Sequence, residues 1–202
     1  MASSPTLVLA THNSGKVAEF RTLLQALPLT LRTLDAWPEA PEVEEDANTL
    51  RGNALKKARA IHDHTGHAAL ADDTGLEVAA LNGRPGVHTA RFAGPNATDA
   101  ENIAHLLGAL EEADTRAAQF RTVIALVTPE RTHCVEGICT GTIAETPRGT
   151  GGFGYDPVFV PDGHTSSFAE MEADAKNAIS HRRRALDALQ SVLDAEFEAF
   201  FA

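Results

Sequence analysis

The stretch Thr6–Leu27 limits the possible folds more than any other part of the sequence. It begins with a short apolar run, Thr6–Ala10, which predicts a buried strand. A polar loop, Thr11–Lys16, follows, and apolar residues then recur at helical spacing from Val17 to Leu27. The order strand, loop, helix therefore puts a polar segment at the start of a helix.

This polar loop has features of a phosphate-binding site. We expect Ser14 to be the N-cap of the helix. Free N–H groups at a helix N-terminus favour an anion, and Lys16 adds a full positive charge there. The loop is not a Walker A sequence, because its first glycine is missing and Val17 follows the lysine. The alternative is an ordinary capped helix with a lysine that faces solvent.

Two adjacent carboxylates follow the next apolar run. Ala68–Ala71 predicts a short buried strand that ends in Asp72-Asp73-Thr74-Gly75, and Leu76–Ala80 predicts a further strand. Ligands gather at strand ends in open α/β sheets. Successive side chains on a strand point to opposite faces, so one aspartate is expected to face the ligand and the other to support the loop. The alternative is a simple Asx turn.

An acidic run, Glu42–Asp46, precedes a helix predicted from Asn48 to His64. The run contains Glu44 and Glu45. It is either a solvated loop or the source of one carboxylate that reaches a divalent cation.

The stretch Gly149–Pro157 reads Gly-Thr-Gly-Gly-Phe-Gly-Tyr-Asp-Pro. Glycines let the backbone approach a ligand closely, and rings set among them can stack on a flat ligand. The alternative is a mobile glycine-rich loop. Downstream, Ser180 is expected to cap a last helix whose first turn holds four cationic residues, His181–Arg184. Because cations there oppose the helix dipole, they indicate an anion or a purine edge, or else a solvated basic turn.

Charge and composition exclude several functions. The chain has 202 residues and a formal net charge of −11, whereas proteins that bind duplex nucleic acid usually carry a basic surface. A polyphosphate ligand would need a few local Lys and Arg residues and a metal ion. No apolar run approaches the ~18 residues of a membrane helix, and no signal peptide is evident, so we expect a cytoplasmic protein. Cys134 and Cys139 match no redox or zinc spacing and are expected to be structural.

Three separated stretches together resemble one family, the inosine/xanthosine triphosphate pyrophosphatases. The likeness runs from Leu7 to Leu186. The stretches that carry it are Leu9–Lys16, Ala71–Val78 with Pro85–Gly94, and Gly149–Pro157 with Lys176–Arg182.

This resemblance implies a mixed α/β fold, with a twisted mixed sheet, flanking helices and two lobes around a central nucleotide-binding cleft. It implies one domain over residues 1–202 and assembly as a homodimer. The implied reaction is Mg²⁺-dependent hydrolysis of non-standard purine nucleoside triphosphates (ITP, dITP and XTP). The products are the nucleoside monophosphate and pyrophosphate, and the reaction would cleanse the nucleotide pool.

The resemblance also implies roles for individual residues. Asp73 corresponds to the general base and a metal ligand, and Glu45 to the second metal ligand. Glu44 remains an alternative, because the acidic run carries no strong motif. The residues implied to bind substrate are Thr11, His12, Asn13, Ser14, Gly15, Lys16, Thr74, Phe153, Gly154, Tyr155, Asp156, Lys176, His181 and Arg182. Two positions depart from the family pattern. His12 stands where the family usually has Gly or Ser, and His88 stands where Tyr is common.

Two other functions remain open. One is a pyrophosphatase for other modified nucleotides, such as methylated pyrimidine triphosphates; the glycine–aromatic loop and the Ser180-His181-Arg182 segment argue against it. The other is a nucleotide-sensing module without chemistry, which the carboxylates Glu45, Asp72 and Asp73 argue against. An interaction protein built on the acidic surface would explain none of the three stretches. Neither a nucleic acid nor a membrane is an expected partner.

Overall fold

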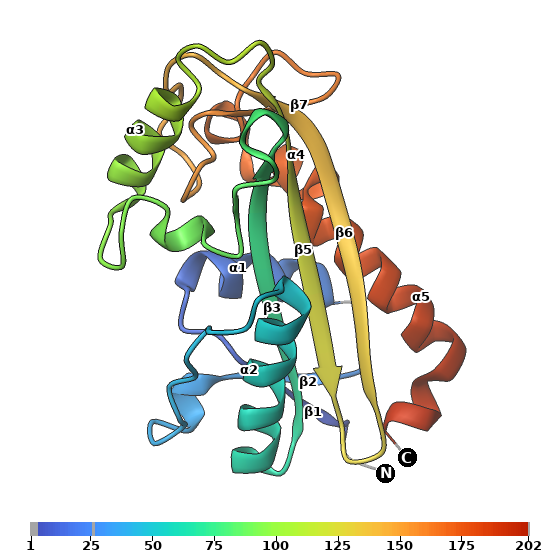
Figure 1. Ribbon diagram of the computed structural model, residues 1–202. Helices are drawn as coiled ribbons and strands as arrows, with labels where there is room; N and C mark the ends of the chain where they lie inside the picture. Colours follow the sequence, from blue (N-terminus) through green and yellow to red (C-terminus); the bar gives the residue numbers. More distant parts are fainter. Residues whose placement is uncertain (1–3, 26, 202) are drawn as a thin grey trace. The chain divides into compact units, whose positions relative to one another are not determined.

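Strands of this chain pair into one mixed sheet. The computed structural model describes residues 4–25 and 27–201, and within them seven strands follow the order β2-β1-β3-β5-β6-β7, with β4 beside β3 (Figure 1). β1 pairs in parallel with β2 and β3, whereas β4 runs antiparallel to β3 and β7 antiparallel to β6. The strands are β1 (Thr6–Leu9), β2 (Thr30–Thr33), β3 (Ala68–Val78), β4 (Pro85–Gly86), β5 (Ala117–Val127), β6 (Thr132–Ile143) and β7 (Phe159–Pro161).

Five α-helices lie in the same described ranges, so the mixed α/β fold is confirmed. They are α1 (Ser14–Leu24), α2 (Leu50–Thr65), α3 (Asp99–Ala109), α4 (Ala173–Ile179) and α5 (His181–Phe201). Short 3₁₀ turns occupy Leu34–Ala36, Ala79–Leu81, Thr89–Arg91 and Phe168–Glu170. No described helix is long and apolar enough to cross a membrane.

The chain divides into two compact units. The first comprises Met1–Asp73, Thr122–Gly137 and Ala185–Ala202, and the second comprises Thr74–Arg121 and Ile138–Arg184. Each unit has a separate hydrophobic cluster.

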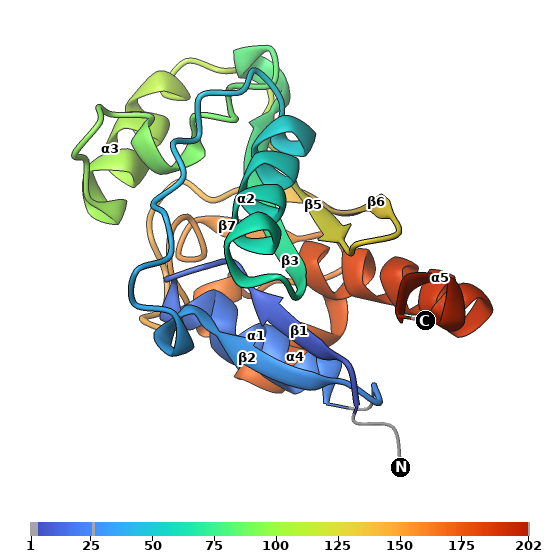
Figure 2. The ribbon, with the colours of Figure 1, turned by 90° about the horizontal axis from the view of Figure 1, so that it is seen from below.

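In the first unit, the alternation of side chains along the strands decides which helix meets which face. Leu7, Leu9 and Leu70 pack with residues of α1 and α5 in one apolar cluster. The intervening residues, such as Val8 and Ala69, are fully buried on the opposite face, where α2 lies (Figure 2). The first part of β3 is therefore covered by helices on both faces, which explains why its sequence is continuously apolar up to Ala71.

In the second unit, α3 packs its apolar stripe on the distal part of β3 and on β5. Ile103, Leu106 and Leu110 belong to one cluster with Leu76 and Val78. Phe120, Phe159 and Phe168 add a group of aromatic rings, with centroids 4.7 Å apart for Phe120 and Phe159 and 5.0 Å apart for Phe159 and Phe168.

Most predicted elements are present, and two local predictions are wrong. Asp72–Gly75 is not a turn between two strands, because β3 runs without interruption from Ala68 to Val78 and ends in a 3₁₀ turn. Ser14 is not the N-cap of α1. Asn13 takes that place, since its side chain accepts a hydrogen bond from the Lys16 N–H. The cap predicted for α5, at Ser180, is confirmed, and α3 begins with a capping box formed by Thr98 and Glu101.

Candidate functional site

The predicted phosphate loop begins directly after β1 and ends in the first turn of α1. The Asn13 side-chain oxygen accepts from the Lys16 N–H at 3.0 Å, and the Thr11 hydroxyl accepts from the Asn13 N–H at 3.2 Å. These two bonds fix the loop at the strand–helix junction, where the backbone N–H groups of Ser14 and Gly15 lie in the first turn. The local geometry is therefore that of an anion-binding helix terminus.

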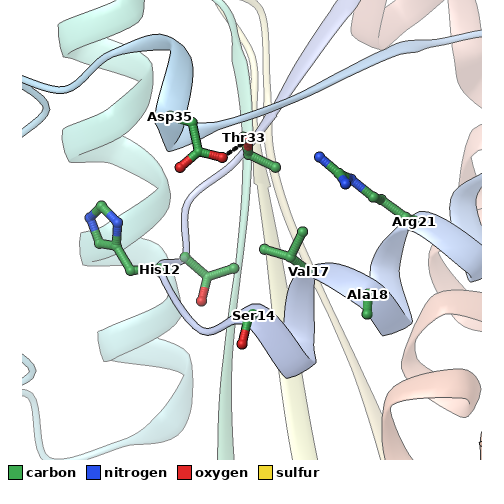
Figure 3. Close-up of a pocket in the computed structure, with 8 residues that line it drawn as sticks. His12, Ser14, Val17, Ala18, Arg21, Thr33 and Asp35 are labelled. Carbon is green, nitrogen blue, oxygen red and sulfur yellow. Dashed lines mark hydrogen bonds between the residues drawn. The ribbon is translucent and has the colours of Figure 1, made fainter.

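A pocket of about 290 Å³ opens beside this loop. Figure 3 shows His12 and Ser14 on one side of it and Asp35, which accepts a hydrogen bond from the Thr33 hydroxyl at 2.8 Å, on another. Its lining is completed by Thr11, Val17, Ala18 and Arg21. His12, the residue that departs from the family pattern, is exposed at this pocket.

The two adjacent aspartates on β3 turn to opposite faces, as predicted. Asp72 lies on the α1 face, where its Oδ2 is 3.1 Å from the Nζ of Lys16, and its side chain is fully shielded from solvent. Asp73 lies on the α2 face, where its Oδ2 accepts from the Asn53 Nδ2 at 3.0 Å. One strand therefore supports the phosphate loop with one carboxylate and presents the other toward α2.

Lys57 of α2 joins Asp73 to the acidic run. Its ammonium forms a short contact with Glu45, lies 3.8 Å from the Asp73 Oδ1 and donates to the Asp72 carbonyl at 2.7 Å. Glu45, and not Glu44, is thus the member of the acidic run that shares a cation with Asp73. Asn53 supports this arrangement from the same helix, because its Oδ1 accepts from the Ala47 N–H at 2.9 Å and holds the end of the acidic run.

Lys57 and Asn53 were missed by the sequence analysis. Asn53 is fully buried on α2. A polar amide on the buried face of a helix usually needs a fixed partner, so this position carried a usable signal. Lys57 carried none, because its partners lie on other elements.

Burial raises the pKa of the Asp73 carboxyl from an ordinary value of 3.8 to about 6. Desolvation is the main cause, and the neighbouring Glu45 adds to it, while Lys57, Asn53 and Lys16 act in the opposite direction. A carboxyl with a pKa close to neutrality can accept and release a proton, which is the property of a general base.

The carboxylates of Glu45 and Asp73 supply oxygen donors, the type of ligand that Mg²⁺ uses. Among residues 4–25 and 27–201, no group of three or more His, Cys, Asp or Glu side chains is placed to hold a metal. Mg²⁺ commonly uses one or two carboxylates together with water and substrate phosphates. Glu45 and Asp73 both contact the Lys57 ammonium, so these two oxygen donors already gather around one positive charge.

In the second unit, Asp156 organises the glycine-rich loop. Its buried Oδ2 accepts from the Phe153 N–H and from the Lys176 Nζ, both at 2.8 Å. Gly152 has φ +71°, and a Cβ at this position would lie 2.0 Å from the same oxygen. Glycine is therefore required at 152 both by backbone conformation and by space.

The Phe153 ring is half-buried and lies under two cations. The Lys176 Nζ is 4.9 Å from the ring centroid and the Arg182 Cζ is 5.8 Å from it. An Nη of Arg182 also approaches the Thr74 hydroxyl at 3.4 Å. Four residues predicted to bind substrate, Thr74, Phe153, Lys176 and Arg182, are thus close to one another, with Asp156 beneath them.

Tyr155 and His181 are buried among protein groups. The Tyr155 hydroxyl donates to the Thr89 carbonyl at 3.0 Å, and burial raises its pKa above the ordinary range. The His181 ring stacks on Phe120, with centroids 4.6 Å apart. Gly154 offers its N–H to Asp99. His88, the second departure from the family pattern, is exposed.

The predicted site residues therefore form two sets. In the first unit, Lys16 meets Asp72, and Glu45 meets Asp73 through Lys57. In the second unit, the Phe153–Asp156 loop meets Lys176 and Arg182.

Comparison with known proteins identifies relatives of this chain that match it over most of its length. The sequence model of the Ham1 family matches residues 7–192. The dITP/XTP pyrophosphatase of Geobacter sulfurreducens is 49% identical over 190 residues, which cover 93% of this chain and 96% of that protein. The solved structure of a HAM1 protein from Coxiella burnetii has a TM-score of 0.87 and 44% identity, with 95% of this chain and 99% of that chain covered. The solved structure of the Ham1 protein from Staphylococcus aureus has a TM-score of 0.86 and 36% sequence identity, with 95% of this chain and 99% of that chain covered.

Proposed function

This chain belongs to the Ham1 family, and we propose that it hydrolyses non-standard purine nucleoside triphosphates to the monophosphate and pyrophosphate. The substrates are ITP, dITP and XTP. A relative 49% identical over 93% of the chain is named a dITP/XTP pyrophosphatase. The single structural observation that carries the proposal is the Asp72–Asp73 pair, which supports a cationic phosphate loop on one face of β3 and a second carboxylate group on the other.

We assign the triphosphate to the loop Thr11–Lys16. Its N–H groups and the Lys16 ammonium supply positive potential, and the 3.1 Å contact with Asp72 holds that ammonium at the loop. Hydrolysis of a phosphoanhydride depends mainly on positioning and on neutralising charge. Lys16 accordingly stabilises the negative charge that develops on the departing pyrophosphate.

Glu45 and Asp73 are the residues that would hold Mg²⁺. When bound, this ion supplies charge neutralisation for phosphate oxygens and lowers the pKa of bound water. Asp73 takes the proton from the water that attacks the α-phosphorus. Asn53, whose Nδ2 lies 3.0 Å from the Asp73 Oδ2, keeps the carboxylate oriented for this transfer.

We assign the purine to the loop Phe153–Asp156 with Lys176, His181 and Arg182. The Phe153 ring offers a stacking surface. Hypoxanthine and xanthine carry an acceptor oxygen at C6, whereas adenine carries a donor amino group. Donors aimed at O6 would face another donor in ATP, and such unpaired polar groups discriminate strongly. GTP shares O6, so discrimination against GTP would have to act at its 2-amino group.

We also propose that the protein acts as a homodimer in the cytoplasm, where its substrates arise, and that its two units function as one domain. The family resemblance supports the dimer. Size-exclusion chromatography with light scattering tests it at micromolar concentration, and a monomer of 21.4 kDa would contradict it.

A substrate panel tests the proposed function. With Mg²⁺, pyrophosphate release should be at least about a hundredfold faster, as kcat/KM, from ITP, dITP and XTP than from ATP or GTP. Equal turnover of GTP and ITP would contradict the proposed discrimination. Faster turnover of a methylated pyrimidine triphosphate would favour the pyrimidine alternative, and binding of ITP without turnover would favour a sensing module.

A further inference from the structure

Asp99 lies outside the residues assigned to the substrate, yet it contacts the loop that we assign to the base. It is the first residue of α3, directly after the N-cap Thr98, and its Oδ2 accepts from the Gly154 N–H at 2.7 Å. The two residues are separated by 55 positions in the sequence. The contact therefore ties the glycine-rich loop to a different element of the same unit.

The neighbouring N–H of the loop is held in the same way. Asp156 accepts from the Phe153 N–H at 2.8 Å, so two consecutive N–H groups, of Phe153 and Gly154, each donate to a carboxylate. Hydrogen bonds to charged acceptors are stronger than neutral ones. Because Gly152 and Gly154 both have positive φ, the loop backbone needs such restraints to remain in one conformation.

The helix that carries Asp99 is itself tied to the preceding segment by side-chain hydrogen bonds. Buried Asn102, on the next turn of α3, accepts from the Ala93 N–H at 2.9 Å and donates to the Ala90 carbonyl at 3.1 Å. Thr89 directly precedes the segment held by these two bonds, and its carbonyl accepts from the Tyr155 hydroxyl at 3.0 Å. The start of α3 and the segment 89–93 thus hold the loop at Gly154 and at Tyr155.

We propose that Asp99 is a positioning residue for purine binding, acting through Gly154 to hold the Phe153 ring in place beneath its cationic partners, Lys176 and Arg182. This inference rests on the proposed function, because it assumes that the Phe153–Asp156 loop receives the base. Asp99 itself touches no substrate. Its loss should weaken substrate binding without altering the chemistry at Asp73.

Three variants separate this role from the general role of an acidic residue at a helix N-terminus. Asp99→Ala removes both the acceptor and the charge, whereas Asp99→Asn keeps an acceptor oxygen and removes only the charge. Glu101→Gln is the matched control, because Glu101 lies in the same helical turn, is exposed like Asp99, and bonds the N–H and hydroxyl of Thr98 instead of the loop.

Two measurements on the full chain are needed. Hydrogen exchange of a peptide spanning residues 149–157 should be about tenfold faster in Asp99→Ala than in the wild type, close to the wild type in Glu101→Gln, and intermediate in Asp99→Asn. The KM for ITP should rise about tenfold in Asp99→Ala, with kcat changed less than about twofold.

Equal hydrogen-exchange rates of the 149–157 peptide in Asp99→Ala and Glu101→Gln would show that the contact between Asp99 and Gly154 does not restrain the loop. Faster exchange with an unchanged KM would overturn the positioning role, as would a loss of kcat at constant KM. If the wild-type protein did not hydrolyse ITP, the proposed function would fail, while the exchange comparison would still confirm or overturn the tie between Asp99 and the loop.

Discussion

The ammonium of Lys16 lies 3.1 Å from the Oδ2 of Asp72, although one residue belongs to the first turn of α1 and the other to β3. The carboxylate is fully shielded from solvent, and the lysine side chain is only 16% exposed. This ion pair connects the proposed phosphate loop to the strand that carries the proposed general base, so Lys16 and Asp73 are both positioned by the same segment of β3.

Lys16→Met should destabilise the protein. Removing one partner leaves a buried carboxylate without its nearest cation, which typically costs about 3 kcal/mol or more. Urea denaturation at pH 7 measures the change. Lys56→Met is the matched control, because Lys56 pairs with Asp46 at the exposed surface and its loss should change little. Equal stability of the two variants would contradict a structural role for the Lys16 contact.

Asp73→Asn should stabilise the metal-free protein at high pH. The folded-state pKa of about 6 exceeds the ordinary value of 3.8, so the folded state binds more protons than the unfolded state, and stability falls as pH rises from about 4 to 6. Above that range the ionised carboxylate costs about 3 kcal/mol, which the amide avoids.

Thermal unfolding in EDTA tests whether Asp73→Asn is more or less stable than the wild type. Asp73→Asn should melt above the wild type at pH 8, and the difference should shrink toward zero near pH 4. Asp46→Asn serves as the control, because a hydrogen bond with Lys56 lowers the pKa of this exposed carboxyl and no gain is expected. A less stable Asp73→Asn at pH 8 would show that burial does not dominate at this position.

Glu45→Gln should raise the Mg²⁺ concentration that gives half-maximal activity by about tenfold or more, because a neutral amide is a poorer ligand than a carboxylate. The measurement is pyrophosphate release from saturating ITP during a Mg²⁺ titration. Glu44→Gln, which changes the adjacent exposed residue, should leave the titration curve unchanged. A shift in Glu44→Gln alone would transfer the ligand role to Glu44.

Gly152→Ala should impair substrate binding more than backbone strain alone predicts. Its Cβ would collide with the Asp156 Oδ2, whereas Gly163 has a similar φ of +80° and open space around it. Gly163→Ala therefore reports the cost of positive φ by itself, about 1 kcal/mol. We expect the KM for ITP to rise about tenfold in Gly152→Ala and to stay constant in Gly163→Ala. A constant KM in both Gly152→Ala and Gly163→Ala would show that Asp156 does not contribute to the binding of the base.

Local sequence pattern predicted the structural features that depend on a single strand, helix or loop. The alternation along β3 predicted that Asp72 and Asp73 would face opposite ways, and the glycine spacing predicted the irregular loop at residues 149–157. The pattern wrongly predicted a break at Asp72–Gly75, because two carboxylates in a strand interior normally indicate a turn. The strand can continue through both aspartates because each has a partner on a helix. Lys16 of α1 pairs with Asp72, and Asn53 of α2 donates to Asp73.

Contacts between distant elements could not be predicted in this way. The link from Lys57 to Glu45 and the link from Gly154 to Asp99 join residues 12 and 55 positions apart. No periodicity or spacing reports such a pair, because the contact depends on how helices and loops pack against the sheet.

The proposed reaction is hydrolysis between the α and β phosphates of ITP. ³¹P NMR of wild-type protein incubated with ITP and Mg²⁺ tests it most directly, with Asp73→Asn as the variant that should bind ITP but leave it intact. We expect the ITP signals to be replaced by those of IMP and pyrophosphate in equal amounts. Formation of IDP and inorganic phosphate, or unchanged ITP in the wild-type sample, would contradict it.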